Sequence, residues 1–258
     1  MSSLWRIWVL ASNTYREAVR DKLLYNLLLF AGLMIASSIL LAQIQIGKDD
    51  RIYRDVGLSS IAFFGVLIAI FVGINLVHKE LSTKTVYTML AKPVRRWEFL
   101  LGKYAGLLTL LAVEVGIMSA CFLCVLVWTG AIFEMGLVWS IVLIYCELAL
   151  VTAIAMFFSS FTTPYLSGMF TIAVWIIGHL LADLRAFGSK SDLPGLKELL
   201  EALYWTLPNL DRLDIKADAS AGRPIELARV AGAALYAWLY SFVLMSGAVL
   251  LFQRRDFR

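Results

Sequence analysis

Two glutamates are the titratable side chains that stand out in this sequence. Glu114 and Glu147 each lie in the middle of a long apolar run. A charged group is costly in a bilayer, so such a carboxyl marks a substrate pathway, a seam between subunits or a hydrogen-bonded packing group. Neither has a basic partner in the neighbouring apolar sequence, and both the functional and the packing interpretation stay open. Asn75, late in another apolar run, is typical of polar contacts between helices.

Other kinds of chemical site are not predicted. The sequence has no glycine-rich phosphate loop and no His-Glu-x-x-His pattern, so we expect neither ATP binding by a Walker motif nor a metal site of that type. The two histidines, His78 and His179, are far apart in the sequence. We therefore expect no catalytic residue, no metal and no cofactor on this chain, which is predicted not to be an enzyme.

A charged segment, residues 78–103, separates two of the apolar runs. Its own apolar residues fall at the spacing of one helix face: Val86, Met89, Leu90, Pro93 and Val94. Proline does not continue a helix interior, so we expect an amphipathic helix over about residues 82–91, a bend at Lys92-Pro93 and a further interfacial turn into the next apolar run. A helix of this kind lying under a membrane favours docking of a cytosolic partner.

The composition is that of an integral membrane protein. Of 258 residues, 60% are hydrophobic and 16% are charged, whereas a soluble domain has about half and about a quarter. Basic residues at membrane edges explain the net charge of +4, so no nucleic-acid partner is expected. About 20 apolar residues cross a bilayer, which predicts six transmembrane helices at about residues 23–44, 57–77, 104–128, 136–158, 165–182 and 227–252.

Two amphipathic segments lie outside the six predicted spans. Residues 1–22 are expected to form a helix in the membrane interface. The external connection, 183–226, has leucines at helical spacing over 196–207, which predicts an amphipathic helix on the membrane surface or over the bundle, followed by a turn at 217–224. Lys and Arg are more numerous on the face that carries both termini and residues 78–103, so the positive-inside rule places that face and both termini in the cytoplasm.

The charged segment resembles the signature of ABC-2 type transporter permeases. The resemblance is to the small six-span permeases of the nitrous-oxide-reductase maturation and gliding-motility types. It rests on the stretches Glu80-Leu81-Ser82-Thr83-Lys84-Thr85-Val86-Tyr87, Leu90-Ala91-Lys92-Pro93-Val94-Arg95-Arg96 and Gly102-Lys103-Tyr104. Weaker similarity at residues 11–22 and 204–210 extends it over nearly the whole chain.

This resemblance implies one ABC-2 type transmembrane domain over residues 1–258, all-α, in a type V-like exporter of the bacterial inner membrane. Residues 1–22 would be its elbow helix and residues 82–91 the helix that couples it to a separate ATPase subunit, which carries ATP and Mg²⁺. A second, identical permease, membrane lipid and a periplasmic partner at the external loop are the other partners it implies. The residues expected at the ATPase-coupling interface are Glu80, Ser82, Lys84, Val86, Met89, Leu90, Lys92, Pro93, Arg95 and Arg96.

Two other functions stay open at this point. An ion-coupled secondary transporter would use Glu114 and Glu147, although the sequence shows no internal repeat of the kind such transporters have. A membrane anchor would transmit the work of an ATPase without moving a solute. The sequence does not identify a cargo.

Overall fold

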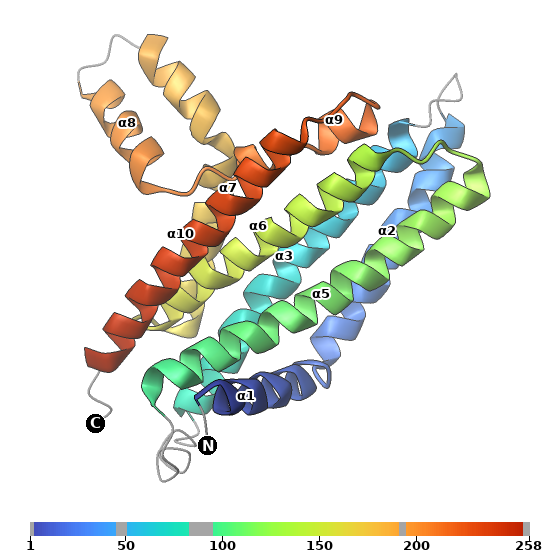
Figure 1. Cartoon of the computed structure of the whole chain (residues 1–258). Coiled ribbons are helices and arrows are strands. Elements are labelled where there is room, and N and C mark those ends of the chain that lie inside the picture. The colour runs from blue at the N-terminus through green and yellow to red at the C-terminus, as the bar shows by residue number, and fades with distance from the viewer. Residues whose placement is uncertain (1–2, 45–50, 83–94, 191–194, 255–258) are drawn as a thin grey trace.

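The computed structural model describes residues 3–44, 51–82, 95–190 and 195–254, and in these residues it contains helices and no strand. Figure 1 shows the long helices side by side in a slanted bundle. In chain order they are α1 (Ser3–Ala18), α2 (Lys22–Ile44), α3 (Arg51–Ser82), α5 (Arg96–Thr129), α6 (Met135–Ser159), α7 (Pro164–Lys190), α8 (Leu196–Thr206), the 3₁₀ turn η1 (Asp211–Leu213), α9 (Lys216–Ser220) and α10 (Leu227–Arg254).

The predicted membrane-spanning helices are present. Within the described residues, five stretches are long and apolar enough to cross a membrane: Arg51–Ile74, Trp97–Thr129, Met135–Ser159, Pro164–Gly188 and Leu227–Leu251. A shorter apolar stretch, Leu24–Leu40, lies in α2. These stretches coincide with the six predicted spans, so the all-helical, multi-span fold is confirmed.

Three helices continue past the apolar runs that predicted them. Helix α3 runs on to Ser82, α5 already begins at Arg96, and α7 continues to Lys190, into the predicted external loop. A helix keeps its backbone hydrogen bonds in water as well as in lipid, so it need not end where the hydrocarbon ends. Residues 96–103 are consequently part of one continuous α5, about 50 Å long at 1.5 Å per residue, and not a separate interfacial turn.

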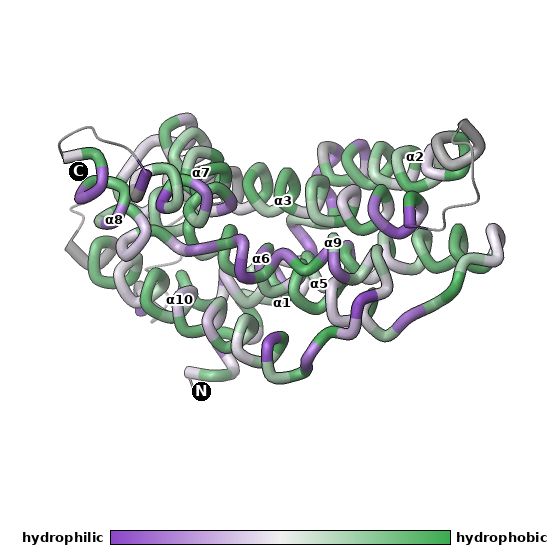
Figure 2. The backbone as a smooth tube through the Cα atoms, turned by 90° about the horizontal axis from the view of Figure 1, so that it is seen from above, coloured by the Kyte–Doolittle hydropathy of each residue, from purple (hydrophilic) through white to green (hydrophobic). Residues whose placement is uncertain are grey.

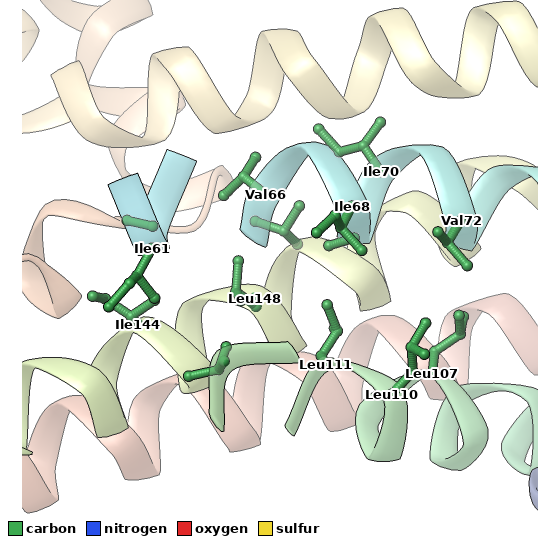
Figure 3. Close-up of a cluster of buried hydrophobic side chains, with 14 of the residues drawn as sticks. Ile61, Val66, Ile68, Ile70, Val72, Leu107, Leu110, Leu111, Ile144 and Leu148 are labelled. Atoms are coloured by element: carbon green, nitrogen blue, oxygen red, sulfur yellow. The ribbon is translucent and has the colours of Figure 1, made fainter. Parts of the chain in front are cut away.

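Helices α3 and α6 form the centre of the bundle, and α5 packs against both. Figure 3 shows isoleucine, valine and leucine side chains of these three helices meeting between the ribbons. Helices α3 and α6 approach closely at Gly65 of α3, where an added Cβ would lie 2.6 Å from a methyl carbon of Leu148 in α6. In lipid, such close van der Waals packing replaces the hydrophobic effect as the main attraction between helices.

Two tyrosines join α5 to α6 reciprocally. The Tyr104 hydroxyl of α5 donates to the carbonyl oxygen of Ala149 in α6 at 3.1 Å. The Tyr145 hydroxyl of α6 donates to the carbonyl oxygen of Leu108 in α5 at 3.2 Å. Sliding one helix along the other would break both bonds, so this pair fixes the register of α5 on α6.

The helix ends divide into two groups. Figure 1 shows α1, the end of α3, the start of α5 and the end of α10 at one end of the bundle, called here the α1 end, and α9 at the opposite end. Seen from above in Figure 2, α2 and the α7–α8 pair lie on opposite sides of an elongated bundle. This grouping agrees with the predicted topology, in which the N-terminal helix, the segment 78–103 and the C-terminus share one face.

At the α9 end, Arg54 links α3 to Glu134 and to α9. Arg54 of α3 is 6% exposed; its guanidinium donates to Glu134 at 3.0 Å and to the carbonyl oxygen of Ser220 in α9 at 3.4 Å. Gly222 has φ +67°, and an added Cβ there would come 2.7 Å from the Glu134 carboxylate. The left-handed conformation favours glycine here, and a larger residue would also displace the Glu134 carboxylate.

The external connection carries two helices. The amphipathic helix predicted over 196–207 is α8, which packs on the end of α7. The predicted turn at 217–224 is wrong in its first half, because residues 216–220 form α9. Asp218 of α9 accepts hydrogen bonds from Arg229 and Arg223, each at 3.0 Å, and these bonds hold the pKa of its carboxyl below the usual range. Those contacts favour a helical turn here over an open loop.

Candidate functional site

The structure describes the predicted coupling residues only in part, and those that it describes lie at the α1 end. Glu80 and Ser82 belong to the last turn of α3, and Arg96 is the first residue of α5, but their side chains lie outside the described part of the chain. Arg95 is described and exposed. The remaining members of the predicted interface also lie outside the described residues: Lys84, Val86, Met89, Leu90, Lys92 and Pro93. The helix expected over 82–91 and its docking role stay predictions.

The start of α5 is set by a capping interaction. Arg95 is extended, with φ −76° and ψ 147°, and its N–H donates to the Glu98 carboxylate at 3.0 Å. A glutamate that reaches back in this way satisfies a backbone donor that has no partner within the helix. Glu98 is also 2% exposed, so the first turn of α5 is held in place by a buried carboxylate.

Helix α1 packs against this first part of α5 through two glycines. A Cβ added at Gly102 would lie 2.6 Å from the Cβ of Leu10, and one added at Gly106 would lie 2.7 Å from the carbonyl oxygen of Ala11. Only hydrogen at these positions lets the two backbones approach so closely. No helix contact was predicted at Gly102 or Gly106, although their Gly-x-x-x-Gly spacing is a known signal of helix–helix contact.

Two ion pairs flank the glycine contacts. Arg6 of α1 lies 3.5 Å from the carboxylate of Glu98, and Glu17 of α1 lies 3.9 Å from the ammonium group of Lys103. Lys103, like Glu98, is 2% exposed. Separating α1 from α5 would take one charged partner from each of these two buried groups, which is destabilising. The α1–α5 contact is therefore both sterically and electrostatically specified.

Glu147 of α6 has polar partners on α7. Its Oε1 accepts a hydrogen bond from the indole N–H of Trp175 at 2.9 Å and lies 3.4 Å from Nε2 of His179. The other ring nitrogen of His179 is 3.0 Å from the carbonyl oxygen of Trp175. This partner was not predicted, because His179 is distant from Glu147 in the sequence and comes close to it only when α7 packs against α6.

Glu114 of α5 is different. It is 1% exposed, and neither carboxylate oxygen has a hydrogen-bond partner among the described residues. The structure therefore separates the two glutamates that the sequence placed together: Glu147 links α6 to α7, whereas the Glu114 carboxyl is buried without a hydrogen-bond partner in the described part of the chain. Asn75 lies in α3, with its side chain outside the described part.

This difference predicts opposite responses to methionine, which matches glutamate in length. Glu147→Met should lower stability by about 1–3 kcal/mol, since it leaves the Trp175 N–H without an acceptor. Glu114→Met should leave stability unchanged or raise it, because it removes a buried polar group that makes no hydrogen bond in the described part of the chain. Apparent melting temperatures in the same detergent measure both. Equal losses in the two variants would contradict the assignment.

The described residues contain no group of three or more His, Cys, Asp or Glu that could hold a metal ion. The described part of the site consists of charged residues in the first turns of the long helix α5 and of helix α1, which is fixed to those turns. A chain built in this way, with apolar helices crossing the bundle and a charged connection between α3 and α5, is a multi-pass membrane protein.

The chain belongs to the ABC-2 family of transporter proteins, whose family model matches residues 8–257. It is therefore the membrane component, or permease, of an ABC transporter. No match to a curated protein was found.

Proposed function

We propose that this chain is the permease subunit of an ATP-driven exporter in the bacterial inner membrane, with the α1 end in the cytoplasm. A separate ATPase subunit docks at residues 78–103 and binds ATP and Mg²⁺, while the permease itself carries no cofactor. Two identical permeases pair in the membrane. ATP-driven closure of the ATPase pair displaces the helix at 82–91, and α3 and α5 carry the displacement into the bundle.

The observation that supports this proposal most directly is the continuity of the two helices that flank the charged connection. Helix α3 runs unbroken to Ser82, and α5 starts at Arg96 with a capped first turn. A displacement of the short segment between them would reach the core along two stiff helices. Hydrogen bonds from Tyr104 and Tyr145 then pass it from α5 to α6.

The proposal is tested by purifying the tagged chain in mild detergent and identifying soluble proteins that accompany it. We expect a stoichiometric ATPase with a Walker motif. Reversing the charge at Glu80 or Arg95 should weaken its binding at least about tenfold, since like charges across an interface cost several kcal/mol and 1.4 kcal/mol is tenfold. Lys197→Glu, an exposed reversal on α8 at the other end of the bundle, is the control and should bind normally. A chain that purifies alone would contradict the proposal.

A second candidate function, ion-coupled transport, is favoured by one observation only, the buried carboxyl of Glu114. Transport that persists without an ATPase but is lost in Glu114→Met, with an unchanged melting temperature, would support that function instead.

A further inference from the structure

The contact between α1 and α5 has a single, regular register. Three pairs advance together along the two helices: Arg6 with Glu98, Leu10 with Gly102, and Thr14 with Gly106. Each step is about one helical turn on both helices. The helices therefore run alongside each other in the same direction, and α1 follows the first turns of α5 instead of crossing them at one point.

Steric contact opposes sliding along this register. At the two glycines the backbone of α1 comes close to α5, with the carbonyl oxygens of Ile7 and Ala11 facing Gly102 and Gly106. A shift of α1 by one residue would bring these carbonyls against α5 positions that carry side chains. Thr14, against Gly106, is 2% exposed, which shows how completely the contact is filled.

The charges oppose separation. Arg6 pairs with Glu98 at the start of the contact, and Glu17 pairs with Lys103 near the end of α1. Glu98 and Lys103 are each 2% exposed, so pulling α1 away would take a partner from two buried charges. Glu98 occupies a special position, because the same carboxylate also caps the first turn of α5 at Arg95.

The connection between α1 and the next span, α2, is short. After Ala18 the chain makes a tight turn in which Val19 donates to Tyr15 and Asp21 donates to Ala18, each at 2.9 Å, and α2 begins at Lys22. Any movement of α1 is therefore passed on to α2 within a few residues.

We propose that α1 and the first four turns of α5, residues 96–109, form one rigid body that moves as a unit in the transport cycle, with Glu98 as its positioning residue. A displacement of the charged connection then reaches two spans at once, α5 directly and α2 through α1. This inference rests on the proposed function and adds to it a route that does not pass through α3.

The test replaces the Arg6–Glu98 ion pair by a covalent link. In a chain whose native cysteines Cys121, Cys124 and Cys146 are changed to alanine, Arg6→Cys and Glu98→Cys are joined by a short thiol-specific crosslinker. The readout is the ATPase rate of the complex relative to the ATPase alone. We expect the reduced double variant to lose the stimulation of the cysteine-free parent, and the crosslinked one to regain it. Crosslinked complexes that assemble but stay unstimulated, with activity returning only when the link is cleaved, would overturn the proposal.

A matched control is available in the same chain. Arg185 of α7 and Glu201 of α8 form an ion pair at the same 3.5 Å, exposed and away from the α1 end. Crosslinking Arg185→Cys to Glu201→Cys should leave the stimulation unchanged. If the cysteine-free parent itself neither binds nor stimulates an ATPase, the proposed function is wrong. If the parent does both and only the crosslinking result is contrary, the rigid-body inference alone is wrong.

A second measurement avoids changing the contact. Spin labels at Leu4 on α1 and Thr109 on α5, both exposed, report the distance between the two helices by pulsed electron paramagnetic resonance. We expect one distance distribution that is the same without nucleotide and with ATP bound to the complex. A shift of that distribution on ATP binding would show that α1 moves relative to α5 and would overturn the proposal even if the double cysteine variant fails to fold.

Discussion

Replacing Gly106 by leucine is expected to separate α1 from α5 and to destabilise the protein by about 1–3 kcal/mol, the usual result of forcing extra atoms into a filled contact. The reason is local. A Cβ at this position would lie 2.6 Å from the Cβ of Thr14 and 2.7 Å from the carbonyl oxygen of Ala11. The second of these is backbone, which cannot move aside without shifting the whole of α1. The apparent melting temperature in detergent measures the loss.

The same helix supplies the control for this substitution. Gly116 of α5 has no atom within 4 Å of an added Cβ. Gly116→Leu should therefore keep or slightly raise the melting temperature, since leucine favours a helix over glycine by up to about 1 kcal/mol. If both variants lose stability equally, the close approach at Gly106 is not what holds α1 in place.

The second large effect is expected at the opposite end of the bundle, where Glu134→Met should cost more stability than Arg54→Met. Losing Glu134 leaves the guanidinium of Arg54 buried, with the Ser220 carbonyl as its one remaining acceptor among the described residues. Breaking a buried pair costs about 3–5 kcal/mol, and we expect the lower end of that range because the Glu134 side chain is 34% exposed. Losing Arg54 instead leaves a carboxylate that water can reach.

The double variant completes this prediction. With both residues changed to methionine, no buried charge is left alone, so stability should recover relative to Glu134→Met. Thermal unfolding of the two single variants, the double variant and the parent forms a double-mutant cycle. Losses that simply add would mean that Arg54 and Glu134 do not depend on each other.

The sequence predicts well what the bilayer dictates. Helices α6 and α10 begin and end within two residues of their predicted bounds. Helix α6 ends there because a turn at residues 160–161 follows directly where its apolar run stops. Helices α3 and α7 are longer than predicted, since hydropathy reports the thickness of the hydrocarbon and not the end of a helix.

The packing of α1 shows what a single sequence does not contain. The helix predicted over residues 1–22 had the membrane surface as its expected partner. In the structure Ile7, Leu10, Ala11 and Thr14 face α5, whereas Leu4, Trp5 and Trp8 remain exposed. The helix has two apolar sides, and only the position of α5 decides which is covered. Likewise, nothing in the sequence pairs Glu147 with His179.

The parallel contact of α1 with α5 also has a consequence for biosynthesis. Arg6 leaves the ribosome roughly ninety residues before its partner Glu98, an interval of about 5–20 s at ordinary rates of translation. During that time the side of α1 that later covers the glycines has no protein partner. The exposed Trp5 and Trp8 give the nascent helix a surface suited to the lipid headgroups. Helix α1 can therefore stay bound to the membrane surface until α5 is inserted beside it.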